Sequence, residues 1–183
     1  MKRVIGAAAL FLMVLVGCKD EKSTDASADK PAVTEIETTN NYQVILDVIV
    51  KKDDNLSLFY TIDGTDNFFT IQPIWVNVKG SDNVQQATYN LPADVVPTAL
   101  RLDFGLAKNQ EDIVFKKITV KHLDKTFTAD GSKIWDYFGP NPITCTVDKN
   151  TGVIKAIVKN GERQSPSLYP GLTLLGQALA GIK

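Results

Sequence analysis

The chain has 183 residues, with 20 basic and 21 acidic side chains and a formal net charge of −1. If residues 1–17 are removed, Lys2 and Arg3 go with them, which leaves 18 basic against 21 acidic residues and a net charge near −3. A weakly acidic chain has no electrostatic footprint for nucleic acid or for an anionic lipid surface. This length predicts a single domain that is large enough to bury a substantial core.

The first residues have the layout of a secretory signal peptide. Met1-Lys2-Arg3 is basic, and residues 4–16 form an uninterrupted run of apolar or small side chains. As a helix this run would be roughly 20 Å long, which is short of the roughly 30 Å hydrocarbon core of a bilayer. We therefore expect residues 1–17 to be a removable targeting segment rather than a transmembrane anchor.

The end of the apolar run, Leu15-Val16-Gly17-Cys18, resembles the lipobox of bacterial lipoproteins. The resemblance implies that Cys18 receives a diacylglyceryl group, that the signal is cut before it, and that the new amino group takes a further acyl chain such as palmitate. Two or more acyl chains anchor a protein stably in a membrane. A chance cysteine at the end of an ordinary signal peptide is the alternative.

The next three residues, Lys19-Asp20-Glu21, resemble the signal that exports lipoproteins of Bacteroidota to the outer face of the outer membrane. The resemblance implies an outer-membrane protein that is lipid-anchored and exposed at the cell surface. The alternative is that any lipoprotein tether begins with polar residues.

Residues 18–40 contain one proline and no aromatic residue among many small, polar and charged side chains. Such a segment buries too little apolar surface to offset the entropy lost on ordering. We therefore expect a flexible tether at 18–40 and a folded domain at 41–183. With Cys18 lipidated, Cys145 is left alone, so no intramolecular disulfide is expected.

From residue 42 onward, apolar and polar residues alternate as they do in strands with one buried face. Val44, Leu46, Val48 and Val50 share one face of the first strand, and residues 56–62 are expected to pair with it as a hairpin. Similar alternation predicts further strands around residues 74–78, 87–91, 100–104, 113–120, 127, 143–147 and 154–158. The apolar parity changes between Phe115 and Ile118, which predicts a β-bulge at Lys116-Lys117.

The spacing of Leu172, Leu175, Leu179 and Ile182 predicts one short amphipathic helix at the end of the chain. Many short strands without helical crossovers favour antiparallel sheets over a parallel sheet. The expected fold is therefore an all-β, jelly-roll-like antiparallel sandwich of about eight or nine strands, with a short C-terminal helix.

The sequence offers little for catalysis, so we expect a protein that is not an enzyme. His122 is the single histidine, which rules out a multi-histidine zinc site, and we expect it to be packed or capped, with Cys145 as a buried, inert thiol. Asp63, Asp66 and Asn67 could offer oxygen ligands to calcium, but they lack EF-hand spacing and are also ordinary turn residues. No cofactor and no metal are expected.

Carboxylates that could in principle serve a glycosidase are scattered along the chain. They are equally well interpreted as solvated or salt-bridged groups, and the candidates are Asp103, Glu111, Asp112 and Asp136.

Trp75 and Asn77 are expected on the strand face opposite Ile74, Val76 and Val78. An exposed aromatic ring beside amides and charged groups is suited to sugars, because the ring can stack on a pyranose while polar groups bind hydroxyls. Arg101 and Asp103 could share this face if their strands are neighbours. We therefore predict ligand binding by Trp75, Asn77, Arg101 and Asp103. The alternative is that Trp75 is buried under the C-terminal helix or under the aromatic residues of 135–138.

Segments around Phe59-Tyr60, Phe68-Phe69 to Gly80, residues 100–103 and residues 137–141 resemble β-sandwich modules of the carbohydrate-binding or galactose-binding-like type. The resemblance implies a noncatalytic domain that binds a surface glycan or a related ligand. The alternative is a structural or assembly lipoprotein that docks a protein partner of the envelope, and a glycan-active enzyme is the third hypothesis. The expected partners are thus the membrane, through lipid on Cys18, and a glycan or an envelope protein, with no nucleic acid.

Overall fold

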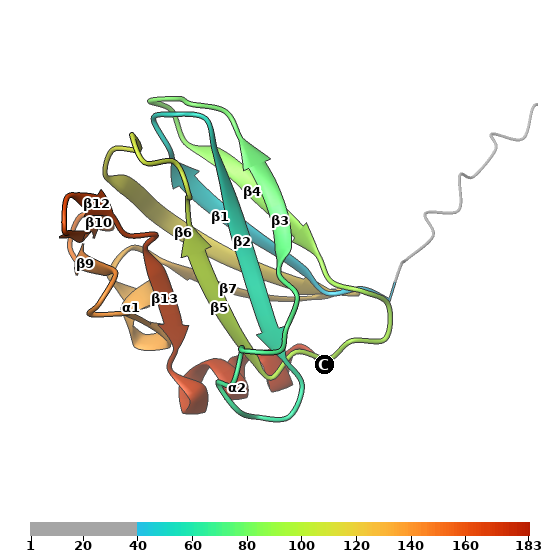
Figure 1. Ribbon diagram of the computed structural model, residues 1–183. Coiled ribbons are helices and arrows are strands. Elements are labelled where there is room, and N and C mark those ends of the chain that lie inside the picture. The colour runs from blue at the N-terminus through green and yellow to red at the C-terminus, as the bar shows by residue number, and fades with distance from the viewer. Residues whose placement is uncertain (1–39) are drawn as a thin grey trace, which may run out of the picture. The chain divides into compact units, whose positions relative to one another are not determined.

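The computed structural model describes residues 40–183 (Figure 1). The predictions for residues 1–39 lie outside this range. They comprise the signal peptide, lipidation of Cys18, the export signal and nearly all of the tether.

Two antiparallel sheets pack against each other (Figure 1). In the first sheet, the strand order is β4 (Gln85–Asn90), β1 (Gln43–Ile49), β6 (Ile113–His122), β10 (Val153–Ala156) and β9 (Cys145–Asp148). A sixth strand, β7 (Lys125–Asp130), also pairs with β6. In the second, the order is β3 (Ile74–Val78), β2 (Asp54–Thr61), β5 (Ala99–Phe104), β13 (Ser167–Pro170) and β8 (Phe138–Pro140).

A few short elements complete residues 40–183. They are the β11–β12 ribbon (Val158–Lys159 and Glu162–Arg163), a single 3-10 turn η1 (Gly131–Lys133), helix α1 (Ile134–Tyr137) and helix α2 (Leu172–Gly181). The predicted all-β sandwich with a C-terminal helix is confirmed, although the described strands number thirteen and several have only two to four residues.

The core lies between the two sheets, where the alternating sequence pattern places its apolar residues. Val44, Leu46, Val48 and Val50 are at most 1% exposed, as the parity of the first strand predicts. From the opposite sheet, Leu56, Leu58, Leu100, Leu102 and Phe104 are completely buried. Each buried aliphatic or aromatic side chain contributes about 1.5–3 kcal/mol relative to exposure, so this double layer is the main source of stability.

The β-bulge predicted in β6 is present at the expected position. Asp47 of β1 lies opposite Lys117, whereas the next residue, Val48, lies opposite Phe115. Lys116 is therefore the extra residue, and Phe115 and Ile118 both reach the core. The insertion restores a common inward face on either side of it.

The hairpin expected between the first two strands is wrong. β1 pairs with β4 and β6, whereas β2 pairs with β3 and β5 in the other sheet. The turn at residues 50–53 carries the chain from one sheet to the other instead of reversing it within one sheet. The predicted strand also ends earlier than expected, because β2 stops at Thr61 and Ile62 is 66% exposed.

The last predicted hairpin has the expected register over its centre. Ile154 lies opposite Val147 and Ala156 lies opposite Cys145. The outermost pair of the predicted hairpin does not face the core, because Ile143 and Val158 are 65% and 64% exposed.

The C-terminal helix packs as its spacing predicts. Of the four residues in the predicted pattern, Leu175, Leu179 and Ile182 are buried and Leu172 at the start of the helix is 39% exposed.

His122 links the first and the last residues of the domain through its side chain. Its ring stacks on Tyr42 with centroids 4.1 Å apart and an interplanar angle of 4°. Nδ1 lies 3.0 Å from the carbonyl oxygen of Ile182, and Nε2 lies 3.0 Å from Oδ1 of Asn40. The imidazole is thus buried and bonded on both sides, as expected of a packed histidine. Asn40, the last residue of the predicted tether, already belongs to the domain through this contact.

Candidate functional site on the outer face of the second sheet

The outer face of the second sheet carries the four residues predicted to bind a ligand. Ser57 of β2 lies opposite Trp75 of β3 on one side and opposite Asp103 of β5 on the other. Side chains opposite each other in a ladder point to the same face, so Trp75, Ser57 and Asp103 form one row across the sheet. Because side chains alternate along a strand, Asn77 and Arg101 share that face. β3 and β5 are separated by β2, so the four residues share a face without being on neighbouring strands.

Trp75 is a half-exposed platform on this face. Its relative exposure is 49%, so neither the C-terminal helix nor the aromatic residues of 135–138 cover it. Those residues pack elsewhere: Trp135 is buried against Phe115 and donates from Nε1 to the carbonyl of Lys149 at 3.1 Å. A half-exposed indole presents a large apolar ring together with an N–H donor, which makes it a candidate contact for a ligand.

Two exposed asparagines lie next along the strands from Trp75. Asn77 follows it on the same face of β3, roughly 7 Å along the strand, and Asn55 of β2 lies directly opposite Asn77. Each amide offers two N–H donors and a carbonyl acceptor, the groups that complement a hydroxyl-rich ligand.

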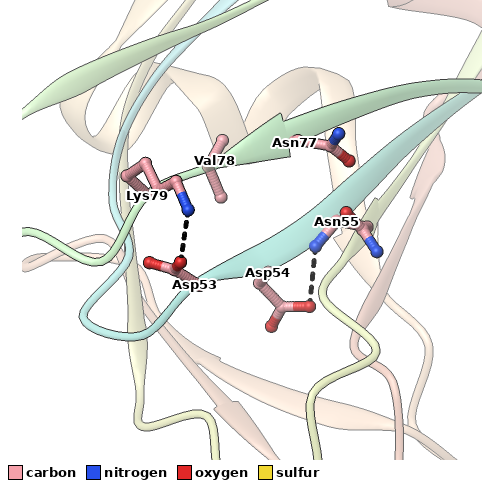
Figure 2. Close-up of a pocket in the computed structure, with 6 residues that line it drawn as sticks. All are labelled: Asp53, Asp54, Asn55, Asn77, Val78 and Lys79. Atoms are coloured by element: carbon pink, nitrogen blue, oxygen red, sulfur yellow. Dashed lines mark hydrogen bonds and ion pairs between the residues drawn. The ribbon is translucent and has the colours of Figure 1, made fainter. Parts of the chain in front are cut away.

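The asparagines border an open hollow of about 500 Å³. Figure 2 shows them on one side of it and the ion pair of Lys79 and Asp53 on the other. Lys79 Nζ lies 2.7 Å from Asp53 Oδ2, and Asp53 Oδ1 accepts from the Gly80 N–H at 2.8 Å. The bonds from Gly80 and Lys79 lower the pKa of Asp53, and the bond to Asp53 raises the pKa of Lys79. The charges at this end of the hollow therefore offset each other.

Asp54, which also lines the hollow, is a structural carboxylate. It is 7% exposed, and Oδ1 accepts from the backbone N–H groups of Leu106 at 2.7 Å and Ala107 at 3.0 Å. Its Oδ2 accepts from the side-chain amide of Gln110 at 2.9 Å. With these bonds made, Asp54 shapes the hollow from beneath rather than offering an unoccupied acceptor to a ligand.

Arg101 and Asp103 are bonded to each other. Nε donates to Oδ1 at 2.8 Å and Nη2 donates to Oδ2 at 2.6 Å, a bidentate pair whose side chains are 21% and 17% exposed. The hydrogen bond that Arg101 donates to Asp103 is the main cause that raises the pKa of Arg101, and burial opposes it. Arg101 and Asp103 therefore make their strongest hydrogen bonds to each other and not to a ligand. Trp75, Asn77 and Asn55 remain as the exposed groups of the face.

Three aromatic rings surround the guanidinium. Cζ of Arg101 lies 4.3 Å from the ring centroid of Phe59, 5.3 Å from that of Tyr169 and 5.9 Å from that of Phe68. All three distances are within the range of cation–π attraction. Phe68 comes from the connection between β2 and β3, so Arg101 also holds that connection against the sheet.

Sequence reasoning missed Asn55 and the aromatic partners of Arg101. Asn55 lies just ahead of the strand predicted at residues 56–62, but β2 begins at Asp54, and the alternation Asn55, Ser57, Phe59 places Asn55 on the outer face. For Tyr169 no local signal exists, because its position depends on β13 joining β5.

The remaining candidates for chemistry are not assembled into a site. Among residues 40–183 no group of three or more His, Cys, Asp or Glu side chains is placed to hold a metal ion. Asp63 accepts from the backbone N–H and the hydroxyl of Thr65, which lowers its pKa and makes it an ordinary turn residue. Cys145 is buried beside the carbonyl of Ser167, and burial raises the pKa of its thiol.

The fold and this face define an all-β sandwich with an open, polar and aromatic surface. No family model, curated protein or solved structure was found to match the chain. Within residues 40–183, no helix combines the length and the apolar character needed to cross a bilayer.

Proposed function

We propose that this protein is a lipid-anchored lipoprotein of the outer membrane, exposed at the cell surface, whose sandwich binds a glycan without catalysis. The observation that carries the glycan proposal is the half-exposed indole of Trp75, which lies on one open sheet face with Asn77 and Asn55. An aromatic face is electron-rich and attracts the C–H bonds on the apolar side of a pyranose. The two amides can then donate to and accept from its hydroxyl groups.

The charges around the hollow favour a neutral glycan. The lysine that lines it is paired with Asp53, and Asp54 is satisfied by backbone and side-chain donors. A carboxylated or sulfated sugar would find no unengaged cation among the lining residues and would lie close to two carboxylates. The absence of walls suits a chain of sugars lying along the surface rather than a single sugar in a closed pocket.

Removal of the Trp75 ring is expected to abolish most glycan binding. Affinity electrophoresis of the full chain through gels that contain neutral polysaccharides would identify a ligand, and calorimetry would give its Kd. We expect Trp75→Ala to raise that Kd at least tenfold, about 1.4 kcal/mol, because the stacking surface is lost. Asn77→Ala should raise it by a smaller factor.

The matched control is Leu106→Ala, which removes another large exposed apolar side chain, 56% exposed, from the connection between β5 and β6 rather than from β3. Its Kd should equal that of the wild type. If no polysaccharide retards the protein, or if Trp75→Ala binds as tightly as the wild type, glycan binding through this face is contradicted. Turnover of a polysaccharide by the purified protein would instead favour the enzyme hypothesis.

The anchor is tested separately at Cys18. Radiolabelled palmitate supplied to expressing cells should label the wild-type protein, and Cys18→Ser should abolish the label because it removes the sulfur that accepts the diacylglyceryl group. Cys145→Ser is the matched control and should be labelled normally, since that thiol is buried in the domain. Label retained in Cys18→Ser would contradict lipidation at this residue.

A further inference from the structure

Three hollows at the other end of the second sheet adjoin one another through shared lining residues, and we treat them together as one groove. The first, about 320 Å³, and the second, about 290 Å³, share Tyr169, and the second and the third, about 430 Å³, share Asp66. We call this the Tyr169 groove, and its other lining residues include Pro140, Pro142, Phe69, Asp136, Leu172 and Leu174. It is formed where the β2–β3 connection meets β13, β8 and the start of α2, and it does not include Trp75 or Asn77.

The groove is rimmed by large apolar side chains in contact with water. Phe69 is 98% exposed, Leu174 is 49% exposed and Leu172 is 39% exposed. Ile143, directly after Pro142 in the chain, is 65% exposed. Several such residues around one depression mark an interaction surface, whereas the same residues scattered singly would mean nothing.

The exposed position of Phe69 is fixed by its neighbour. Phe68 packs edge-on against Phe59 and Tyr169, with centroids 6.4 and 6.1 Å apart, and is 4% exposed. The connection is also fastened at Thr65, whose carbonyl accepts from the hydroxyl of Thr61. Because Phe68 is buried, the connection beside it is held against the sheet, and Phe69 is presented to solvent beside the groove.

The charge of the groove selects among partners. Asp66 and Asp136 form no ion pair with any residue of 40–183, and the single cation in the lining, Arg101, is bound to Asp103. Two carboxylates without counterions repel an anionic lipid surface and attract a lysine or an arginine.

We propose that the Tyr169 groove docks an extended segment of a partner protein in which apolar side chains flank a lysine or an arginine. The apolar side chains occupy the hollows on the two sides of Tyr169, and the cation lies against Asp66 or Asp136. This docking surface is independent of glycan binding, since the groove shares neither Trp75 nor its two asparagines.

Selection from a library of random linear peptides tests the proposal. The full chain, purified in detergent and immobilised, should enrich peptides that combine aliphatic or aromatic residues with a lysine or an arginine. Fluorescence anisotropy with the most enriched peptide should show at least fivefold weaker binding to Phe69→Ser and to Asp66→Asn. Binding to the wild type should weaken as salt is raised, and Asp66→Asn should reduce that salt dependence because it removes one charge of the pair.

Leu106→Ser is the matched control and should bind the peptide as the wild type does, because Leu106 is also a large exposed apolar side chain, at 56%, but lies outside the groove. Urea midpoints equal to that of the wild type would show that Phe69→Ser and Asp66→Asn remain folded. Failure to enrich any peptide, enrichment of acidic peptides, or equal binding by wild type and Phe69→Ser would each overturn the proposal. Conversion of a dimer to a monomer by Phe69→Ser in sedimentation would assign the groove to a second copy of this chain and would also overturn it.

Discussion

Asp54→Ala is expected to lower the free energy of unfolding by about 3 kcal/mol, because a buried carboxylate is lost from beneath several N–H groups that have no other partner. Leu106 and Ala107 donate their backbone N–H groups to Oδ1, and Asn55 donates its own to the same oxygen at 2.8 Å. Hydrogen bonds to a charged acceptor are the stronger kind, and a buried donor left without one costs about 1–3 kcal/mol.

The hydrogen bonds around Asp54 also join two connections that are distant in the sequence. Gln110 donates to Oδ2 of Asp54 at 2.9 Å and to the carbonyl of Lys52 at 3.0 Å, and it accepts from the Lys52 N–H at 3.2 Å. The carboxylate therefore fastens the connection between β5 and β6 to the start of β2. Gly105 has a φ of +81°, and a Cβ there would overlap the carboxylate, so the close approach depends on glycine at this position.

Urea unfolding followed by tryptophan fluorescence measures the effect, with Asp53→Ala as the matched control. Asp53 is the adjacent carboxylate of the same hollow, but its side chain is 65% exposed and its partner Lys79 is 89% exposed. Exposed ion pairs contribute little to stability, so Asp53→Ala should shift the urea midpoint much less than Asp54→Ala does. Asp54→Asn should fall between the two, because the amide oxygen can still accept from the backbone. Equal midpoints for Asp54→Ala and Asp53→Ala would contradict the structural role of Asp54.

The alternation of the sequence predicted which way most side chains face, because that property depends only on adjacent residues. Val44 to Val50, Leu100 to Phe104 and the bulge at Lys116 were all predicted in this way. Alternation carries no information about which strand lies beside which. The wrong pairing of β1 with β2 has this origin, since the turn at residues 50–53 could equally have closed a hairpin or passed to the second sheet.

The same distinction separates what could and could not be predicted about the candidate site. The outward position of Trp75 and Asn77 followed from parity within one strand. That Arg101 and Asp103 face the same way also followed from parity, and their opposite charges two residues apart could have suggested the ion pair. The burial of Arg101 could not be predicted, because Phe68 and Tyr169 reach it from a distant connection and a distant strand.

Arg101→Ala is expected to lower the free energy of unfolding by about 3 kcal/mol, because breaking a largely buried pair leaves Asp103 without its counterion. Asp103 is 17% exposed and receives two hydrogen bonds from the guanidinium, at 2.8 and 2.6 Å. The rings of Phe59, Phe68 and Tyr169 also lose the cation they surround, and each such contact contributes about 0.5–2 kcal/mol depending on burial.

The Arg101 variants separate charge from geometry. Arg101→Lys keeps the charge but loses the bidentate fork and the planar stacking surface, so its loss should be intermediate. Lys79→Ala is the matched control, because Lys79 directly follows β3 and is also a cation paired with an aspartate, but it is exposed and its loss should shift the urea midpoint little. Hydrogen exchange adds a local readout: Arg101→Ala should speed exchange in residues 62–73, which Arg101 holds through Phe68, more than in β1. If Arg101→Ala loses no more free energy of unfolding than Lys79→Ala, and exchange in residues 62–73 is unchanged, the aromatic residues hold the β2–β3 connection without the cation.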